Sequence, residues 1–202
     1  MPEQLDALAF SSFLTTLEGE SDRAAAVLAA AFVEEFLLQN LKRRLVLPDL
    51  EILYGGDGAL GSFSRRIAIA QALGWIHDDT ACDLNIIRRI RNKFAHDFDH
   101  GLSFRTQSVK DLTGNLRVGQ AIVGRLKTTA SSLPASPARD MALSQSLAAF
   151  AEPRRLFELS LNMIIAAIAE GMMHPFSSLT DAPSAAAIAG TQISFLVQAA
   201  DA

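Results

Sequence analysis

Residues 22–45 read DRAAAVLAAAFVEEFLLQNLKRRL and carry the strongest structural signal in this chain. When the stretch is drawn as a helix, apolar side chains occupy nearly its whole circumference. Such a helix must be covered by other elements, so we expect residues 22–45 to form the central helix of a bundle. Ser21 is placed to cap this helix, Asp22 lies favourably beside its N-terminal dipole, and Pro48 ends it.

The flanking sequence continues the helical pattern, because its apolar residues recur at 3.6-residue spacing and β-branched residues rarely alternate with polar ones. Ser62 is expected to cap a helix that Gly74 stops. Asp78 and Asp79 are expected to cap the next helix, and Pro153 suits the first position of the last one. The sequence therefore predicts an all-α, multi-helix bundle. Its further helices are expected over residues 3–17, 63–73, 80–96, 106–116, 139–151 and 153–173.

We expect one domain over residues 1–174. A linker is predicted at about residues 128–138, whose sequence TTASSLPASPA has no periodicity. Residues 175–202 form an Ala- and Ser-rich tail to which we assign no function. The glycine-rich stretch YGGDGALG, residues 54–61, is interpreted as a connecting turn, because a Walker loop needs a Lys that is absent here.

The composition excludes several classes of protein. The 202 residues include 18 Lys and Arg against 22 Asp and Glu, which gives a net charge of −4. This charge argues against a protein that binds nucleic acid with its whole surface. The uncharged run at residues 24–33 is too short to cross a bilayer, so no membrane association is expected. No basic leader precedes an apolar stretch at Met1, and the single cysteine, Cys82, cannot form an internal disulfide. We therefore expect a cytoplasmic protein.

The segment with unusual chemistry is DLNIIRRIRNKFAHDFDH, residues 83–100. As a helix it has a buried apolar stripe and, on another face, a polar ridge that includes Asn85, Arg88, Asn92 and His96. Arg91 falls on the margin of the apolar stripe. A guanidinium group in that position needs a partner.

Residues 22–45 offer this partner, because Glu34 falls inside their apolar surface and Glu35 lies next to it. We predict an ion pair from Glu34 or Glu35 to Arg91 or Arg88. The pair either holds two helices together or orients a functional site, and the sequence leaves both interpretations open. The predicted binding or structural cluster consists of Glu34, Glu35, Arg88, Arg91, Asn92 and His96.

No metal and no cofactor are expected. His96, Asp97, Asp99 and His100 form the sequence HDFDH, with Phe98 at its centre, which matches no closed zinc pattern. A histidine at a helix end interacts favourably with the C-terminal dipole and needs no ligand. Cys82 has no basic residue within two positions, so a reactive thiol is not expected.

Three blocks, residues 20–37, 58–76 and 86–99, resemble in order and spacing the mannitol operon repressor (MtlR) family of bacterial proteins. The resemblance implies an all-α fold and a transcriptional regulator of sugar-alcohol uptake. The family has no evident DNA-binding motif, and this sequence contains no helix-turn-helix with a basic recognition helix. We therefore expect a regulator that acts through a protein partner or through homodimerisation, with no support from charge or motif for direct DNA binding.

A shorter resemblance supplies the alternative. Residues 91–96, RNKFAH, resemble the R-polar-x3-H motif of HEPN domains, many of which are ribonucleases. This resemblance implies that Arg91 stabilises a phosphate, Asn92 orients the group and His96 acts as general acid or base. On one helix Arg91 and His96 project about 140° apart, so they converge only at a helix end or across a two-fold dimer. The alternative function is thus RNA binding or metal-independent RNA cleavage, whereas the regulator is expected not to be an enzyme.

Overall fold

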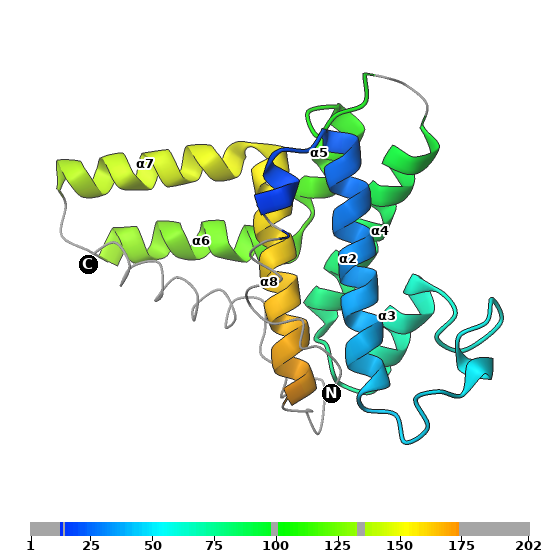
Figure 1. Cartoon of the computed structure of the whole chain (residues 1–202). Coiled ribbons are helices and arrows are strands. Elements are labelled where there is room, and N and C mark those ends of the chain that lie inside the picture. Colours follow the sequence, from blue (N-terminus) through cyan, green and yellow to red (C-terminus); the bar gives the residue numbers. More distant parts are fainter. Residues whose placement is uncertain (1–12, 14, 98–100, 133–135, 174–202) are drawn as a thin grey trace.

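The structure is a computed structural model that describes residues 13, 15–97, 101–132 and 136–173. These residues contain helices and no strand, which confirms the predicted all-α fold (Figure 1). The elements are α2 (Asp22–Lys42), the 3-10 helix η1 (Glu51–Leu53), α3 (Phe63–Ala72), α4 (Asp78–His96), α5 (Gln107–Gly114), α6 (Arg117–Ser132), α7 (Pro137–Ala151) and α8 (Pro153–Met173).

Helix α2 lies inside the bundle, as its apolar sequence predicts. It packs against α3, α4 and α8. Four alanines on its buried surface, Ala25, Ala26, Ala29 and Ala30, are small enough to let neighbouring helices approach closely. By length and composition α2 could also cross a membrane, but about half of it is covered by the rest of the bundle, as in the core helix of a soluble protein.

Helix α4 shares the centre of the bundle with α2. It packs against α2, α3, α5, α6 and α8, and the side chains of Leu84, Ile87, Ile90 and Phe94 are fully buried. Figure 1 shows α2 and α4 running side by side, with α8 on the other side of α2. The segment with the unusual polar residues is therefore also a core helix.

Several predicted helix ends are confirmed. The hydroxyl groups of Ser21 and Ser62 each accept a hydrogen bond from the backbone N–H three residues further on, at 3.2 and 3.4 Å. Gly74 follows α3 with φ of 67°, a left-handed conformation that glycine adopts without a steric penalty. Pro153 is the first residue of α8.

Two predicted ends are wrong. His77 caps α4, because its Nδ1 accepts the backbone N–H of Asp79 at 3.2 Å, while Asp78 and Asp79 lie within the first turn. Histidine is not among the residues that commonly cap helices, so the sequence favoured the aspartates. Helix α2 ends at Lys42, well before Pro48, which sets only an outer limit for the helix.

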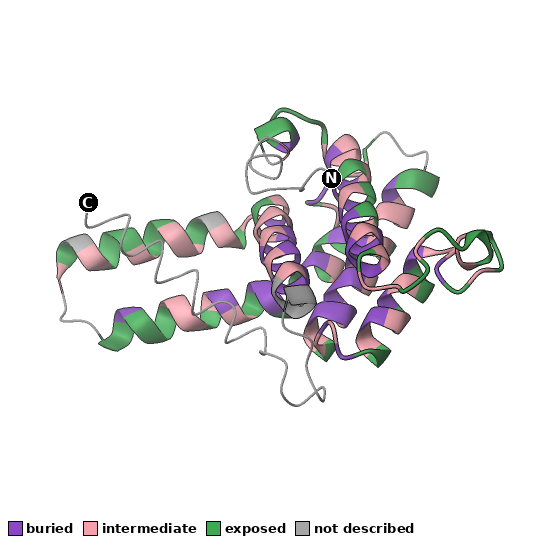
Figure 2. Cartoon of the chain, turned by 60° about the horizontal axis from the view of Figure 1, so that its bottom comes forward, coloured by how far each residue is buried: buried purple, intermediate pink, exposed green. Residues whose placement is uncertain are grey.

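The predicted linker at residues 128–138 is largely helical. Helix α6 continues to Ser132 and α7 begins at Pro137. The two helices pack against each other as a hairpin that projects from the bundle, and much of its surface is exposed or only half-buried (Figure 2). Of the expected helix over residues 3–17, residues 15–17 are helical and most of the remainder lies outside the described residues, as does the tail at 175–202.

Candidate functional site

The predicted polar cluster forms around Glu34, in the middle of α2. Its Oε2 lies 3.5 Å from Nη2 of Arg91 on α4, so the expected ion pair between these helices is present. Its Oε1 lies 3.1 Å from Nη1 of Arg66 on α3. Glu34 thus bridges two arginines and joins three helices.

Arg66 was missed by the sequence analysis. Besides pairing with Glu34, its Nε donates a hydrogen bond of 2.8 Å to the carbonyl oxygen of Leu60. The side chain therefore also fixes the end of the loop between α2 and α3. The sequence around Arg66 does not predict this contact. Arg66 and Glu34 lie far apart along the chain and meet only because α3 packs against α2.

The second arginine changes what we expect from removing Arg91. Arg91→Ala leaves Glu34 paired with Arg66, so the free energy of unfolding should fall by less than about 1 kcal/mol, as for a partly exposed ion pair. Glu34→Gln should cost more, because it leaves two neighbouring guanidinium groups without their shared carboxylate. Urea unfolding of both variants at pH 7 tests this order. A larger loss in Arg91→Ala than in Glu34→Gln would contradict it.

The remaining predicted residues do not join the ion pairs. Glu35 is exposed, and its Oε1 accepts a hydrogen bond from the side-chain amide of Gln39. Asn92 is half-buried, and its side chain has no hydrogen-bond partner within the described ranges. His96 is the last residue of α4 and is exposed. Arg91 pairs with Glu34 on α2, whereas His96 lies five residues further on, at the C-terminal end of α4.

Arg88 is the least satisfied member of the cluster. It lies one helical turn before Arg91, and its residue is half-buried. Its Nε is buried and has no hydrogen-bond partner. Buried donors are nearly always paired, so this nitrogen calls for an explanation.

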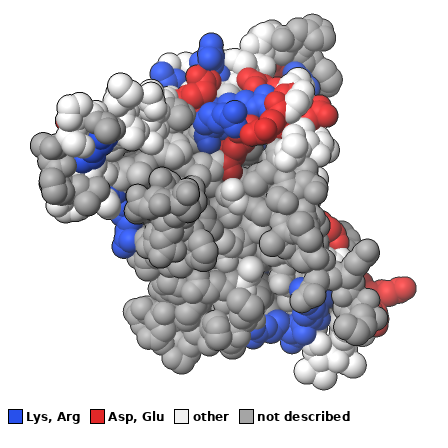
Figure 3. All heavy atoms as spheres, turned by 60° about the vertical axis from the view of Figure 1, so that its left-hand side comes forward, with Lys and Arg blue, Asp and Glu red and all other residues white. Residues whose placement is uncertain are grey.

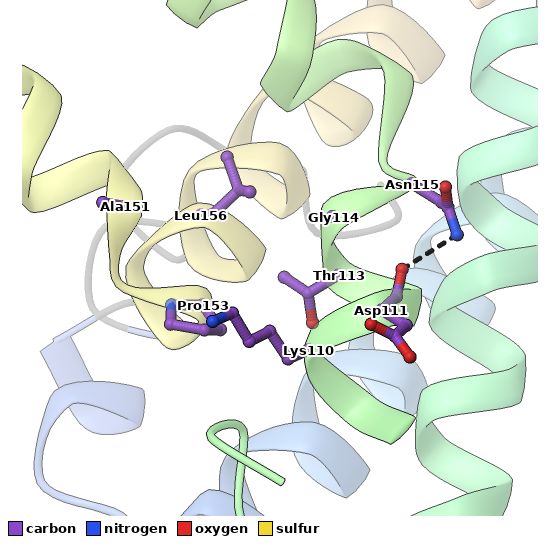
Figure 4. A pocket seen from close by; sticks show the side chains of 8 residues that line it. All are labelled: Lys110, Asp111, Thr113, Gly114, Asn115, Ala151, Pro153 and Leu156. Carbon is purple, nitrogen blue, oxygen red and sulfur yellow. Dashed lines mark hydrogen bonds between the residues drawn. The ribbon is translucent and has the colours of Figure 1, made fainter. Parts of the chain in front are cut away.

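A separate pocket of about 520 Å³ opens between α5 and the junction of α7 with α8 (Figure 4). The side chain of Lys110 extends toward Pro153 across it. The other polar groups are engaged locally, since Thr113 donates to the carbonyl oxygen of Val109 and Asn115 to that of Asp111. No set of polar groups converges on one point in the pocket. Its lining consists of Lys110, Asp111, Thr113, Gly114, Asn115, Ala151, Pro153 and Leu156.

The charged surface is mixed rather than uniformly basic. Figure 3 shows acidic and basic side chains intermingled at the top of one face. Arg154 pairs with Asp22 and Glu158, each at 2.9 Å, and Arg155 pairs with Glu18 at 3.3 Å. At these two arginines the pairings leave little free positive charge for a phosphate backbone. Within the described residues, no group of His, Cys, Asp and Glu has the arrangement of a metal site.

The loop between α2 and α3 exposes large apolar side chains and projects from the bundle (Figure 1). Val46, Leu47 and Ile52 are 95%, 63% and 76% exposed. We call Val46, Leu47, Leu50 and Ile52 the apolar loop. Exposed apolar residues grouped in this way mark protein contact sites.

The comparison with known proteins gives a structural neighbour. No protein-family model matches this chain, and no curated protein matches it. The fold is similar to that of MtlR. The neighbour is a chain of the X-ray structure of the MtlR–HPr complex from Escherichia coli, which aligns with a TM-score of 0.53 and 22% sequence identity over 79% of this chain and 97% of that chain. At this level of identity, the similarity establishes the shared all-α fold.

Proposed function

We propose that this chain is a transcriptional regulator that acts by binding a protein partner. The observation that carries the proposal is the fold shared with MtlR, whose structure was solved in complex with the protein HPr. The three sequence blocks that resemble the mannitol operon repressor family point in the same direction. We propose HPr, or a protein of the same fold, as the partner.

The apolar loop supports binding of a protein. Its side chains lie between α2 and α3, at an edge of the bundle, and each of them is 45% or more exposed. Burying a single leucine or isoleucine side chain at an interface removes apolar area from water and stabilises the complex by roughly 1.5–3 kcal/mol. We therefore place the partner on the apolar loop.

Direct binding of nucleic acid has less support. The chain carries a net charge of −4, and several of its described arginines, Arg105 and Arg154 among them, are paired with carboxylates. A protein that neutralises several phosphates needs free Lys and Arg on one face. We therefore propose that any effect on transcription passes through the protein partner.

Isothermal titration of the full chain with HPr tests the proposal. We expect a complex with wild-type protein and at least tenfold weaker binding with Leu47→Asp, because a carboxylate then faces an apolar contact. The matched control is Met141→Asp on α7, since Leu47 and Met141 are both 63% exposed. Met141→Asp should bind HPr within twofold of the wild type.

Two results would contradict the proposal. The first is the absence of a complex with HPr at protein concentrations of about 100 μM, which excludes even a weak interaction. The second is salt-sensitive binding or cleavage of RNA that is lost in folded His96→Ala, which would support the HEPN-like alternative instead. Equal weakening by Leu47→Asp and Met141→Asp would overturn the assignment to the apolar loop.

A further inference from the structure

The cluster around Glu34 holds more positive charge than its one carboxylate can neutralise. Arg66 and Arg91 each contact one oxygen of Glu34, and Arg88 is a neighbour of Arg91 one helical turn earlier on α4. Among the described residues, Glu34 is the only carboxylate within ion-pair distance of any of these three arginines. The balance is three positive charges against one negative charge.

Many hydrogen-bond donors in this cluster are unused. A guanidinium group has five N–H donors. In Arg66 the Nε contacts Leu60 and Nη1 contacts Glu34, which leaves Nη2 without a contact in the described part of the chain. Arg91 makes its contact through Nη2, and the buried Nε of Arg88 has no hydrogen-bond partner among the described residues.

The surrounding charged groups do not supply the missing anion. Glu35, next to Glu34 on α2, is exposed and accepts a hydrogen bond from Gln39. On α3, Nη1 of Arg65 donates to the carbonyl oxygens of Gly56 and Gly58. Arg89 on α4 is exposed and adds positive charge. An external anion could therefore use the donors that these protein groups leave unpaired.

We propose that Arg66, Arg88 and Arg91 form a binding site for a phosphoryl group. A phosphoryl group carries close to two negative charges at pH 7, which matches the excess charge of the cluster. Its three oxygens accept hydrogen bonds from the planar guanidinium groups, and arginine binds phosphate in this bidentate way more readily than lysine does. Glu34 holds Arg66 and Arg91 in position, whereas Arg88 supplies a guanidinium group whose buried Nε has no acceptor among the described residues. This inference does not depend on the partner proposed above.

Two-dimensional ¹H–¹⁵N NMR of the arginine Nε–H groups tests the proposal directly. Inorganic phosphate is titrated into the full chain at low, constant ionic strength. We expect the Arg88 Nε–H resonance to shift and saturate, because this donor gains an acceptor. Arg88→Gln should weaken phosphate binding at least tenfold, while the control Arg89→Gln, an exposed arginine on the same helix, should change it by less than about twofold.

Further titrations distinguish the source of the phosphoryl group. Glycerol phosphate represents a small phosphorylated compound, and a phosphoserine peptide represents a modified protein segment. Binding of either compound more tightly than inorganic phosphate supports the site and identifies the source of the phosphoryl group. An unchanged Arg88 resonance, or equal loss of binding in Arg88→Gln and Arg89→Gln with both variants folded by circular dichroism, overturns the proposal.

Discussion

Replacing Phe104 by Ala should lower the free energy of unfolding by about 3–5 kcal/mol, the usual cost of removing a buried phenylalanine ring. Phe104 is fully buried between two other buried rings. Its ring centroid lies 5.3 Å from that of Phe94 on α4 and 4.9 Å from that of Phe157 on α8. The tilted rings connect α4 to α8 through a residue that belongs to neither helix, so the cavity left by Ala would weaken both contacts.

Urea unfolding and thermal melting of Phe104→Ala measure this loss. For a chain of this size each kcal/mol corresponds to a shift in Tm of roughly 2–4 °C, so the expected decrease is about 10 °C. Ile52→Ala is the control, because Ile52 is an exposed apolar residue that covers no core, and its Tm should change by less than about 2 °C. Equal effects of the two substitutions would contradict the role of the aromatic contact.

Asp83 should make the protein less stable as the pH rises from 4 to 7. Its side chain on α4 is fully buried. Oδ1 accepts the backbone N–H of Arg117 at 2.8 Å and Oδ2 accepts that of Val118 at 2.9 Å, so the carboxylate caps the N-terminus of α6. Burial raises the pKa of Asp83 from 3.8 to about 6, although the two backbone hydrogen bonds act to lower it.

The sign of the effect follows from proton binding. Between pH 3.8 and about 6 the folded chain retains a proton on Asp83 that the unfolded chain has released. The stability contributed by this proton is complete below pH 3.8 and is lost as the pH rises through 6. The unfolding free energy of the wild type, relative to that of Asp83→Asn, should therefore fall by up to about 3 kcal/mol between pH 4 and pH 7.

Urea unfolding of wild type and Asp83→Asn at several pH values from 4 to 7.5 checks this prediction. The comparison between the two proteins removes the contribution of the other carboxylates, which titrate in both. NMR titration of the Asp83 carboxyl carbon gives the midpoint independently. Parallel stability profiles, or a midpoint near 3.8, would show that Asp83 is not the group responsible.

Patterns within single segments predicted much of this fold. The apolar circumference of residues 22–45 predicts a buried helix, and Ser21, Ser62 and Gly74 mark helix ends by local backbone chemistry. These signals are local because the groups that cap a helix lie within a few residues of the cap. The polar residues of α4 were also identified, and of the pairs expected from Glu34 or Glu35 to Arg91 or Arg88 the structure contains Glu34 with Arg91.

Helix α6 shows where such patterns fail. Residue 116, just before the helix, is a leucine and cannot cap it by a side-chain hydrogen bond, and the helix contains two glycines. The cap comes instead from Asp83 on α4. One of the glycines, Gly119, is required by packing, since a Cβ there would lie 2.6 Å from Oγ of Ser160 on α8. Both features stabilise α6 only in the folded bundle.

The sequence by itself determined the helical class, most helix ends and the few residues among which the ion pair would form, because spacing along one chain segment fixes which side chains share a helix face. The tertiary structure alone decided that Arg66 shares Glu34, that Asp83 caps α6, and that Nε of Arg88 is buried without a partner. The physical reason is that a buried charge is satisfied by whichever groups the packed helices bring near it, and those groups lie far away in the sequence.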